Sequence, residues 1–208
     1  MTFKTCGETP LGIYPLVDRA YKLETLFSLG ISTAQLRIKD LKEKALENEI
    51  KKAIEMSNQY NARLFINDFW ELAIKHKAYG IHLGQEDLET ADLPAIYNAG
   101  IRLGVSTHTT KEIEMALKIQ PSYLAIGPIF ETRSKIVNYN TVGTKELASW
   151  SRNVHYPIVA IGGINLSNIK NIINIKSISG IAMISEFLDK NEISSSKTKL
   201  LLKLFSKK

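Results

Sequence analysis

The chain has 208 residues, 44% of them hydrophobic, with a formal net charge of +6 and a pI near 9.2. This length and composition suit one globular domain, and no apolar run reaches the roughly 18 residues that a membrane span needs. Cys6 is the only cysteine, so a disulfide framework and a cysteine metal cluster are both excluded. A lone cysteine and an N-terminus without an apolar signal segment favour a reducing cytoplasm.

The positive charge is spread along the chain rather than gathered in one patch. The lysines are scattered over predicted helix surfaces and are not interleaved with aromatic residues, so we expect no nucleic-acid partner. Such a charge also suits small phosphorylated ligands. The basic stretch 197–208, KTKLLLKLFSKK, has the pattern of a membrane-surface helix, but a helix that packs its leucines on a sheet is the simpler interpretation. We therefore expect no membrane partner.

Apolar, β-prone runs and helical patterns alternate along the whole chain. The runs are 12–17, 33–38, 63–66, 80–83, 102–105, 123–129, 157–161 and 180–184. The helical patterns are 22–29, 41–60, 69–77, 93–98, 111–119, 145–151, 167–175 and 197–205. Eight strands and eight helices in strict alternation predict an α/β protein, a single (β/α)8 TIM barrel over 1–208 in which residues 1–11 precede the first strand. A doubly wound open sheet is the alternative, but the first turn, Val17-Asp18-Arg19, lacks its usual glycines.

Two aspartates follow consecutive strands of this predicted barrel. The run 63–66 stops at Asn67-Asp68, and the run 80–83 stops at Gly84-Gln85-Glu86-Asp87. Neighbouring parallel strands lie about 5 Å apart, so carboxylates at their ends can share one cation. Without a cation the two carboxylates would repel each other. The pair Asp68 and Asp87 therefore predicts a divalent-metal site at the carboxyl-end rim of the barrel.

Cations alternate along the second predicted strand. Gln35, Arg37 and Lys39 share one face, which we expect to be buried in the barrel mouth. Buried cations are costly unless an anion meets them, so this face predicts an anion site.

Two further segments of the rim suggest phosphate binding. Gly162-Gly163 ends the seventh strand just before a predicted helix start near Ser167, a combination that lets phosphate approach backbone N–H groups; a plain tight turn is the alternative. The long loop 131–143 carries Thr132, Ser134 and Lys135, and we interpret it as a lid that meets phosphate.

The four histidines do not indicate a metal site. His82 and His108 lie near the rim without an HxxxH-type pair, so we assign them structural roles. His76 and His155 are expected at the surface.

Seven segments, in their order and spacing, carry a family resemblance. They are QLRIKD at 35–40, ARLFIND at 62–68, GIHLGQEDL at 80–88, GVSTH at 104–108, GPIFETRSK at 127–135, AIGGI at 160–164 and AMIS at 182–185. Together they resemble the thiamine phosphate synthase (thiamine-phosphate pyrophosphorylase) family, from about residue 12 to 185.

The resemblance implies a transferase with a TIM barrel that joins the two halves of thiamine. It would condense 4-amino-2-methyl-5-hydroxymethylpyrimidine diphosphate with 4-methyl-5-(2-hydroxyethyl)thiazole phosphate, releasing pyrophosphate through a dissociative, pyrimidine-cation mechanism. It implies Mg2+ as cofactor, held by Asp68 and Asp87. The implied pyrimidine diphosphate contacts are Gln35, Arg37, Lys39, Asn67, Ser106 and Lys135. The implied thiazole phosphate contacts are Thr132, Ser134, Gly163, Ile184 and Ser185. Of these, Arg37, Lys39, Ser106 and Lys135 would be catalytic.

The sequence departs from the family pattern in two places. Ser134 stands where the family usually has Thr, and this change keeps the hydroxyl group. The segment 163–185 is one residue longer than the family pattern, with the extra residue near 176–179. Two alternatives stay open. One is a thiazole tautomerase-like isomerase, which by resemblance would have His in place of Pro128 and lack QLRIK and IND. The other is a non-catalytic barrel that binds phosphorylated ligands or RNA. The sequence does not set the oligomeric state, and a homo-oligomer is one option.

Overall fold

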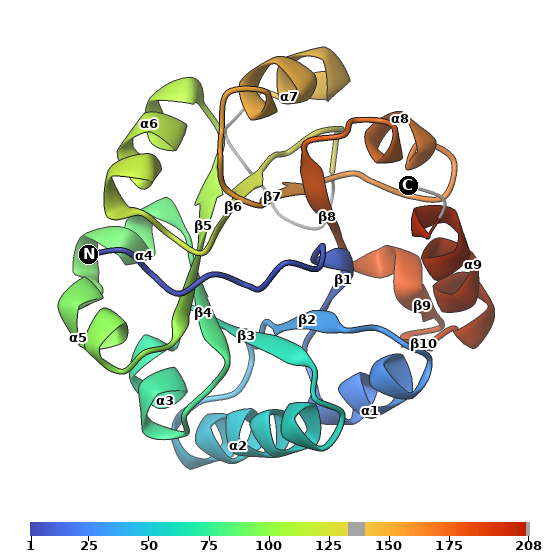
Figure 1. The fold of residues 1–208 in the computed structure, drawn as a ribbon. Coiled ribbons are helices and arrows are strands. Elements are labelled where there is room, and N and C mark those ends of the chain that lie inside the picture. Colours follow the sequence, from blue (N-terminus) through green and yellow to red (C-terminus); the bar gives the residue numbers. More distant parts are fainter. Residues whose placement is uncertain (133–139, 207–208) are drawn as a thin grey trace.

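The computed structural model describes residues 1–132 and 140–206, and eight parallel strands close into a barrel (Figure 1). The strands are β1 Gly12–Val17, β2 Thr33–Leu36, β3 Arg63–Asn67, β4 Gly80–Leu83, β5 Arg102–Thr107, β6 Tyr123–Ile126, β7 Ile158–Ile161 and β8 Ile178–Met183. Each strand pairs in parallel with the next one along the chain, and β8 pairs with β1. The predicted TIM barrel is confirmed, and the open sheet is excluded.

Helices surround the barrel in an outer ring (Figure 1). They are α1 Ala20–Ser28, α2 Glu43–Gln59, α3 Trp70–Lys75, α4 Gln85–Thr90, α5 Leu93–Asn98, α6 Thr110–Ile119, α7 Gly143–Ser151, α8 Lys170–Ile173 and α9 Ser195–Phe205. No helix within the described ranges is long and apolar enough to cross a membrane. The last of them, α9, buries Leu201 and Thr198 and contacts β1, as the barrel-helix interpretation of the C-terminal stretch expects.

The strict alternation predicted from the sequence is wrong in two places. Two helices, α4 and α5, occupy the β4–β5 connection, and α4 starts at Gln85 in the segment expected to be a strand-end loop. A short 3-10 helix η1, Ser185–Phe187, and a hairpin of β9 Leu188–Asp189 and β10 Glu192–Ile193 lie between β8 and α9. Both additions are too short and too polar to give a periodic apolar pattern.

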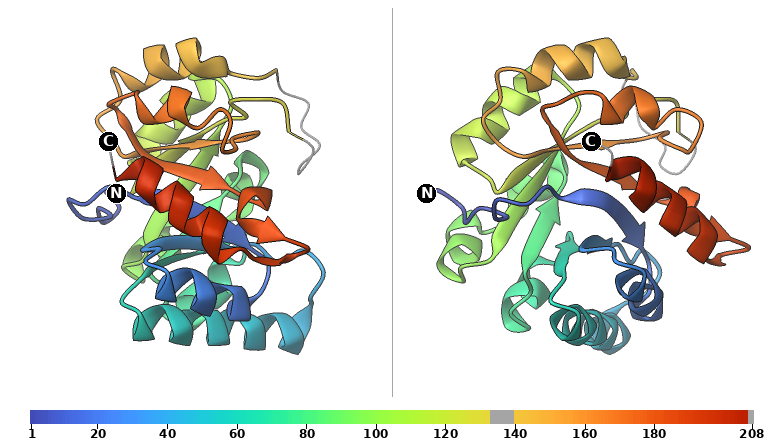
Figure 2. Two further views of the ribbon diagram at one scale, coloured as in Figure 1. Left: turned by 90° about the vertical axis from the view of Figure 1, so that its right-hand side faces the viewer. Right: turned by 45° about the vertical axis from the view of Figure 1, so that its right-hand side comes forward.

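The N-terminal segment before β1 crosses the amino-terminal end of the barrel (Figures 1 and 2). The Arg63 guanidinium donates to the carbonyl oxygens of Thr9 at 3.1 Å and Pro10 at 2.6 Å. The Arg102 guanidinium donates to the Thr5 carbonyl at 2.7 Å. These charge-assisted hydrogen bonds hold the segment at the amino-terminal end of the barrel, opposite the carboxyl ends of the strands.

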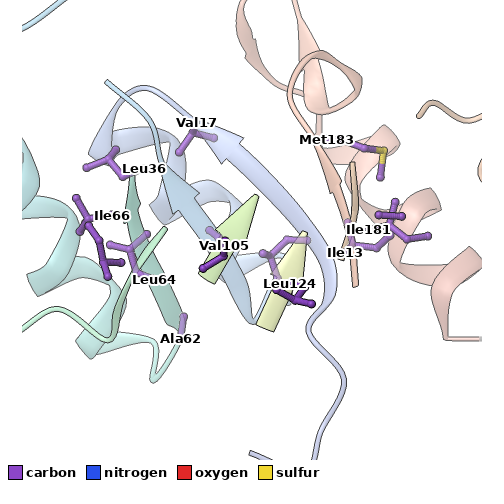
Figure 3. Close-up of a cluster of buried hydrophobic side chains, with 14 of the residues drawn as sticks. Ile13, Val17, Leu36, Ala62, Leu64, Ile66, Val105, Leu124, Ile181 and Met183 are labelled. Carbon is purple, nitrogen blue, oxygen red and sulfur yellow. The ribbon is translucent and has the colours of Figure 1, made fainter. Parts of the chain in front are cut away.

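Strand residues alternate between two hydrophobic clusters. Outward side chains such as Ile13, Leu64 and Ile181 pack against the helices in the larger cluster (Figure 3). Inward side chains form a smaller cluster in the barrel interior, including Tyr14 and Phe65. Since the side-chain period of a strand is two, every second side chain of each strand lies inside the barrel, and the last of these inward side chains lie near the carboxyl end of the strand.

Large aromatic rings fill the barrel interior because glycines make room for them. The Phe65 and Tyr123 ring centroids lie 5.0 Å apart with an interplanar angle of 80°. A Cβ at Gly104 would lie 2.2 Å from Tyr123 Cζ, and one at Gly80 would lie 2.5 Å from Phe65 Cδ1. The aromatic layer forms the floor on which the polar residues of the rim are placed.

Candidate active site

A cavity of about 300 Å³ opens at the carboxyl ends of the strands. Its walls include at least one residue from each of the eight strands or from the segment directly after it. The lining residues are Leu16, Gln35, Arg37, Lys39, Asn67, Asp68, His82, Gly84, Glu86, Asp87, Ser106, Thr107, His108, Ala125, Gly127, Pro128, Thr132, Ile161, Gly162 and Ile184. Seven of the eight residues predicted for the pyrimidine diphosphate and metal sites, all but Lys135, thus line one cavity.

The inward face of β2 leads directly into this cavity. Gln35 is 3% exposed, and Arg37 and Lys39 follow beyond the last strand residue. The prediction that all three cavity-facing residues are buried is wrong for Lys39, whose side chain is 53% exposed. Arg37 is partly exposed, and none of the carboxylates in the described part of the chain forms an ion pair with it. Its guanidinium is therefore available to an anion in the cavity.

Asp68 stands directly after β3 in a conformation that is unusual for its residue type. Its φ is 66°, and its backbone N–H donates to the His82 carbonyl oxygen at 3.1 Å, which ties the end of β3 to β4. A non-glycine residue with positive φ is a feature that the surrounding structure must hold in place. The Asp68 carboxylate accepts a hydrogen bond from Lys39 Nζ at 2.6 Å. This geometry fixes one carboxylate at the cavity wall.

Asp87 does not end a strand, contrary to the expectation from the sequence. β4 ends at Leu83, and Asp87 lies in the first turn of α4, where its Oδ2 accepts from the Gly84 backbone N–H at 3.2 Å. This capping contact turns the carboxyl group back toward the cavity. The two aspartates therefore face the same cavity, but from a strand end and from a helix start.

The electrostatics of the two carboxyl groups suit a divalent cation. Burial and the neighbouring Asp68 charge raise the pKa of Asp87, and the capping contact with Gly84 opposes this only in part. In the described ranges no group of three or more His, Cys, Asp or Glu side chains is arranged to hold a metal by itself. Mg2+ is commonly bound by one or two carboxylates with substrate phosphates and water completing the octahedron. The chemistry of Asp68 and Asp87 fits such a site.

A second cavity of about 280 Å³ adjoins the first beside β7 and β8. Thr132, Ile161, Gly162 and Ile184 line both cavities. The predicted contacts Gly163, Ile184 and Ser185 all line the second cavity. Two ligands could thus meet at the shared wall.

The helix-based part of the predicted phosphate cradle is wrong. α8 begins at Lys170, not near Ser167. The backbone N–H of Leu166 donates to Glu186 Oε1 at 3.3 Å, and that of Ser167 donates to Asn165 Oδ1 at 2.9 Å. These N–H groups are already satisfied, so they do not form an open anion site.

The two glycines at the end of β7 also have a packing role. A Cβ at Gly162 would lie 2.6 Å from Pro128 Cα, and one at Gly163 would lie 2.4 Å from the Glu131 carbonyl oxygen. Both have positive φ, 100° and 65°. The glycines thus let the loop after β6 pass close over β7, which forms the wall between the two cavities.

Comparison with known proteins places these features in a family. A model described as thiamine monophosphate synthase matches residues 14–187. The thiamine-phosphate synthase of Salmonella paratyphi B is 54% identical over 157 residues, which cover 75% of this chain and 74% of that protein. This chain belongs to the thiamine monophosphate synthase family.

Two further relatives agree with this membership. The thiamine-phosphate synthase of Citrobacter koseri is 53% identical over 157 residues, 75% of this chain and 74% of that protein. The structure of a thiamine phosphate pyrophosphorylase from Pyrococcus furiosus matches with a TM-score of 0.83, covering 95% of this chain and 96% of that chain. At 24% identity this second likeness concerns the fold.

Several residues of this thiamine monophosphate synthase family member were not predicted at the site. Glu86 and Thr107 line the first cavity, and Glu131 and Glu186 line the second. Ser134 and Lys135, predicted for the lid, lie outside the described residues, and so does most of that loop. The second cavity therefore has no basic side chain within the described ranges, and carboxylates occupy part of its wall. The only sequence signal for these four unpredicted lining residues was that each lies near a strand end or in the loop 131–143.

The two rim histidines have the structural contacts that the sequence favoured. His108 Nδ1 lies 2.8 Å from Glu112 Oε2, whose carboxylate also accepts from the His108 backbone N–H at 2.7 Å. This pair joins the end of β5 to α6. His82 Nε2 lies 2.8 Å from the hydroxyl oxygen of Ser106, which is one of the residues predicted to bind the pyrimidine diphosphate.

Proposed function

We propose that the protein is a thiamine phosphate synthase that condenses 4-amino-2-methyl-5-hydroxymethylpyrimidine diphosphate with 4-methyl-5-(2-hydroxyethyl)thiazole phosphate. The observation that carries the proposal is the pair of adjoining cavities at the carboxyl ends of the strands, with four shared lining residues. The first contains Arg37, Lys39 and the two aspartates, which suit a diphosphate. The second contains Thr132 and Ser185, whose hydroxyl groups suit the phosphate of the other half.

The metal ligands are part of the same proposal. Asp68 and Asp87 would hold Mg2+, which when bound would neutralise charge on the diphosphate oxygens. Arg37 and Lys39 would bind the same diphosphate from the β2 side, and Lys135 is the further cation implied by the family pattern. Asn67 and Gln35 line the same cavity and would orient the pyrimidine half.

The reaction that we propose is a substitution at carbon that proceeds by dissociation. The C–O bond to the diphosphate breaks first, and pyrophosphate leaves with the electron pair. The thiazole nitrogen then donates its lone pair to the pyrimidine-methyl cation and forms the C–N bond. No proton transfer is required in these two steps, so the site needs cations, positioning and exclusion of water more than a general base. In the described part of the chain, Arg37 and Lys39 of the first cavity would supply the cations.

The two alternatives predict different reactions in the same test. Purified protein is mixed with both half-substrates and Mg2+, and thiamine phosphate is quantified against reactions that lack one half or contain EDTA. The synthase produces thiamine phosphate only in the complete mixture. A tautomerase-like isomerase would change a thiazole substrate alone, and a non-catalytic barrel would convert nothing. The residues QLRIK and IND at the first cavity favour the synthase.

The cellular setting and the assembly stay predictions from the sequence. We propose a cytoplasmic enzyme of small phosphorylated substrates, with a homo-oligomer as one option for its assembly.

A further inference from the structure

A row of hydrogen-bonded side chains leads from the centre of the barrel to the wall of the first cavity. Tyr14 Oη lies 2.9 Å from Tyr123 Oη, which lies 2.7 Å from His82 Nδ1. On the other side of the imidazole, His82 Nε2 lies 2.8 Å from Ser106 Oγ. The four residues come from β1, β6, β4 and β5, and only Ser106 and His82 line the cavity.

The inner part of this row is held rigidly in place. Tyr14 is 1% exposed, Tyr123 is 0% exposed and His82 is 5% exposed. The imidazole is stacked on the Tyr123 ring with centroids 5.6 Å apart and an interplanar angle of 19°. A buried ring in this setting has little freedom to turn, so its two nitrogens keep their separate partners.

The chemistry of the donors sets the direction of the row. A neutral imidazole has one N–H donor and one acceptor nitrogen, and each hydroxyl has one hydrogen to donate. A phenol is more acidic than an alcohol, so its O–H is the stronger donor and is the better partner for the imidazole lone pair. Tyr123 therefore donates to His82 Nδ1. The proton of the imidazole is then on Nε2, and Nε2–H donates to Ser106 Oγ.

Tyr14 forms the other end of the row. Burial raises the pKa of Tyr14 above its usual range, whereas the contacts with Tyr123 and Gln35 oppose the rise. With the single Tyr123 hydrogen directed to His82, the Tyr123 oxygen can only accept from Tyr14. The Tyr14 hydrogen is then directed to Tyr123, and the row runs outward to the cavity.

We propose that His82 is a positioning residue that makes the Ser106 hydroxyl a hydrogen-bond donor to the substrate. Because Ser106 Oγ accepts from Nε2–H, its own hydrogen points into the cavity. The ligand atom opposite it must be an acceptor. Resting on the proposed function, we assign this acceptor to a ring nitrogen of the aminopyrimidine rather than to its amino group. Tyr14 and Tyr123 act through His82 by fixing its tautomer.

The tautomer can be measured in the protein without any substrate. The chain has four histidines, so a nitrogen NMR spectrum of protein labelled with 15N-histidine is simple enough to assign by substitution. His82→Gln identifies the His82 signals, and His155→Gln, at an exposed position, serves as the control. We expect a protonated Nε2 and an unprotonated Nδ1 for His82. A protonated Nδ1 with an unprotonated Nε2 would overturn the proposal.

Kinetics test the consequence for substrate binding. A glutamine in place of His82 can put its amide N–H near the position of Nε2, whereas an asparagine is too short to reach Ser106. We expect His82→Asn to lower kcat/KM for the pyrimidine diphosphate roughly tenfold to hundredfold, and His82→Gln to lower it by about threefold. The KM for the thiazole phosphate should stay unchanged in both variants, which a general loss of structure would not allow.

The outcomes separate this inference from the proposed function. If the wild-type protein forms no thiamine phosphate, the proposed function fails, and the NMR experiment still decides the tautomer. If both variants keep wild-type kinetics, the positioning role of His82 is refuted while the synthase activity stands. If either variant has a lowered Tm, the wild-type NMR spectrum and the His155→Gln control still provide the decision.

Discussion

Replacing Asp87 with asparagine should stabilise the metal-free protein at neutral pH. The pKa of Asp87 is raised by burial and by the neighbouring Asp68 carboxylate. A carboxyl group with a raised pKa favours the folded state only while it is protonated, and this advantage is lost as pH rises through the folded-state pKa. At pH 7 the ionised pair therefore destabilises the fold. The Asp87→Asn substitution removes the charge, and the amide oxygen of the new side chain can still accept from the Gly84 N–H.

The expected magnitude is small because the Asp87 carboxyl is only partly buried. Two like charges a few Å apart near a protein surface repel by about 0.5–1 kcal/mol after solvent screening. In a protein of this size that corresponds to a rise in Tm of about 1–4 °C. Asp68→Asn is the matched control, because it removes the same repulsion but also removes the ion pair with Lys39 at 2.6 Å. We expect its Tm to change less.

Thermal unfolding in EDTA and in Mg2+ measures both parts of this prediction. Mg2+ at ten times its Kd should stabilise the wild type by about 1.4 kcal/mol and Asp87→Asn by much less, so the order of the two Tm values reverses. The difference seen in EDTA should disappear as the pH falls below the pKa of Asp87. A variant that is no more stable than wild type in EDTA at pH 7, or a gain that persists unchanged in acid, would refute the reasoning.

Three further substitutions test other parts of the structure. Arg37→Ala should weaken binding of the diphosphate substrate by roughly 2–4 kcal/mol, measured as a loss of kcat/KM. Lys42→Ala, at an exposed position, should leave kcat/KM unchanged. Equal kinetics for the two variants would show that Arg37 does not bind the diphosphate. Gly104→Ala should lower the unfolding free energy by about 1–3 kcal/mol, since its Cβ would lie 2.2 Å from the Tyr123 ring, and an unchanged denaturation midpoint would contradict the packing described. Arg63→Ala should cost about 1–2 kcal/mol by releasing the N-terminal segment, and hydrogen exchange in that segment should increase; unaltered exchange would count against this anchoring role.

Much of the site was predictable because strand geometry is regular. The period of two places Gln35 on the inward face of β2 and, continued one residue past the strand end, Arg37 at the same cavity, and the same rule places Ser106 on the inward face of β5. Since the eight strands of a barrel end at one rim, residues far apart in the sequence could be assigned to one cavity. The placement of these residues at one cavity follows from these two rules.

The incorrect parts depend on short polar segments. The helix α4 has a single apolar residue, Leu88, so nothing periodic showed that Asp87 belongs to a helical first turn. The helix α8 is only four residues long, and the turn before it uses the N–H groups that were expected to bind phosphate. The contact of His82 with Tyr123 joins residues 41 positions apart, and only the closed barrel brings them together.

The most direct test of the central claim is a phosphorus NMR time course of one reaction with both half-substrates and Mg2+. Our account predicts that thiamine phosphate and pyrophosphate appear together in equal amounts, and that EDTA or the omission of either half-substrate stops both. Pyrophosphate released without thiamine phosphate in the complete mixture, or neither product at all, would contradict it.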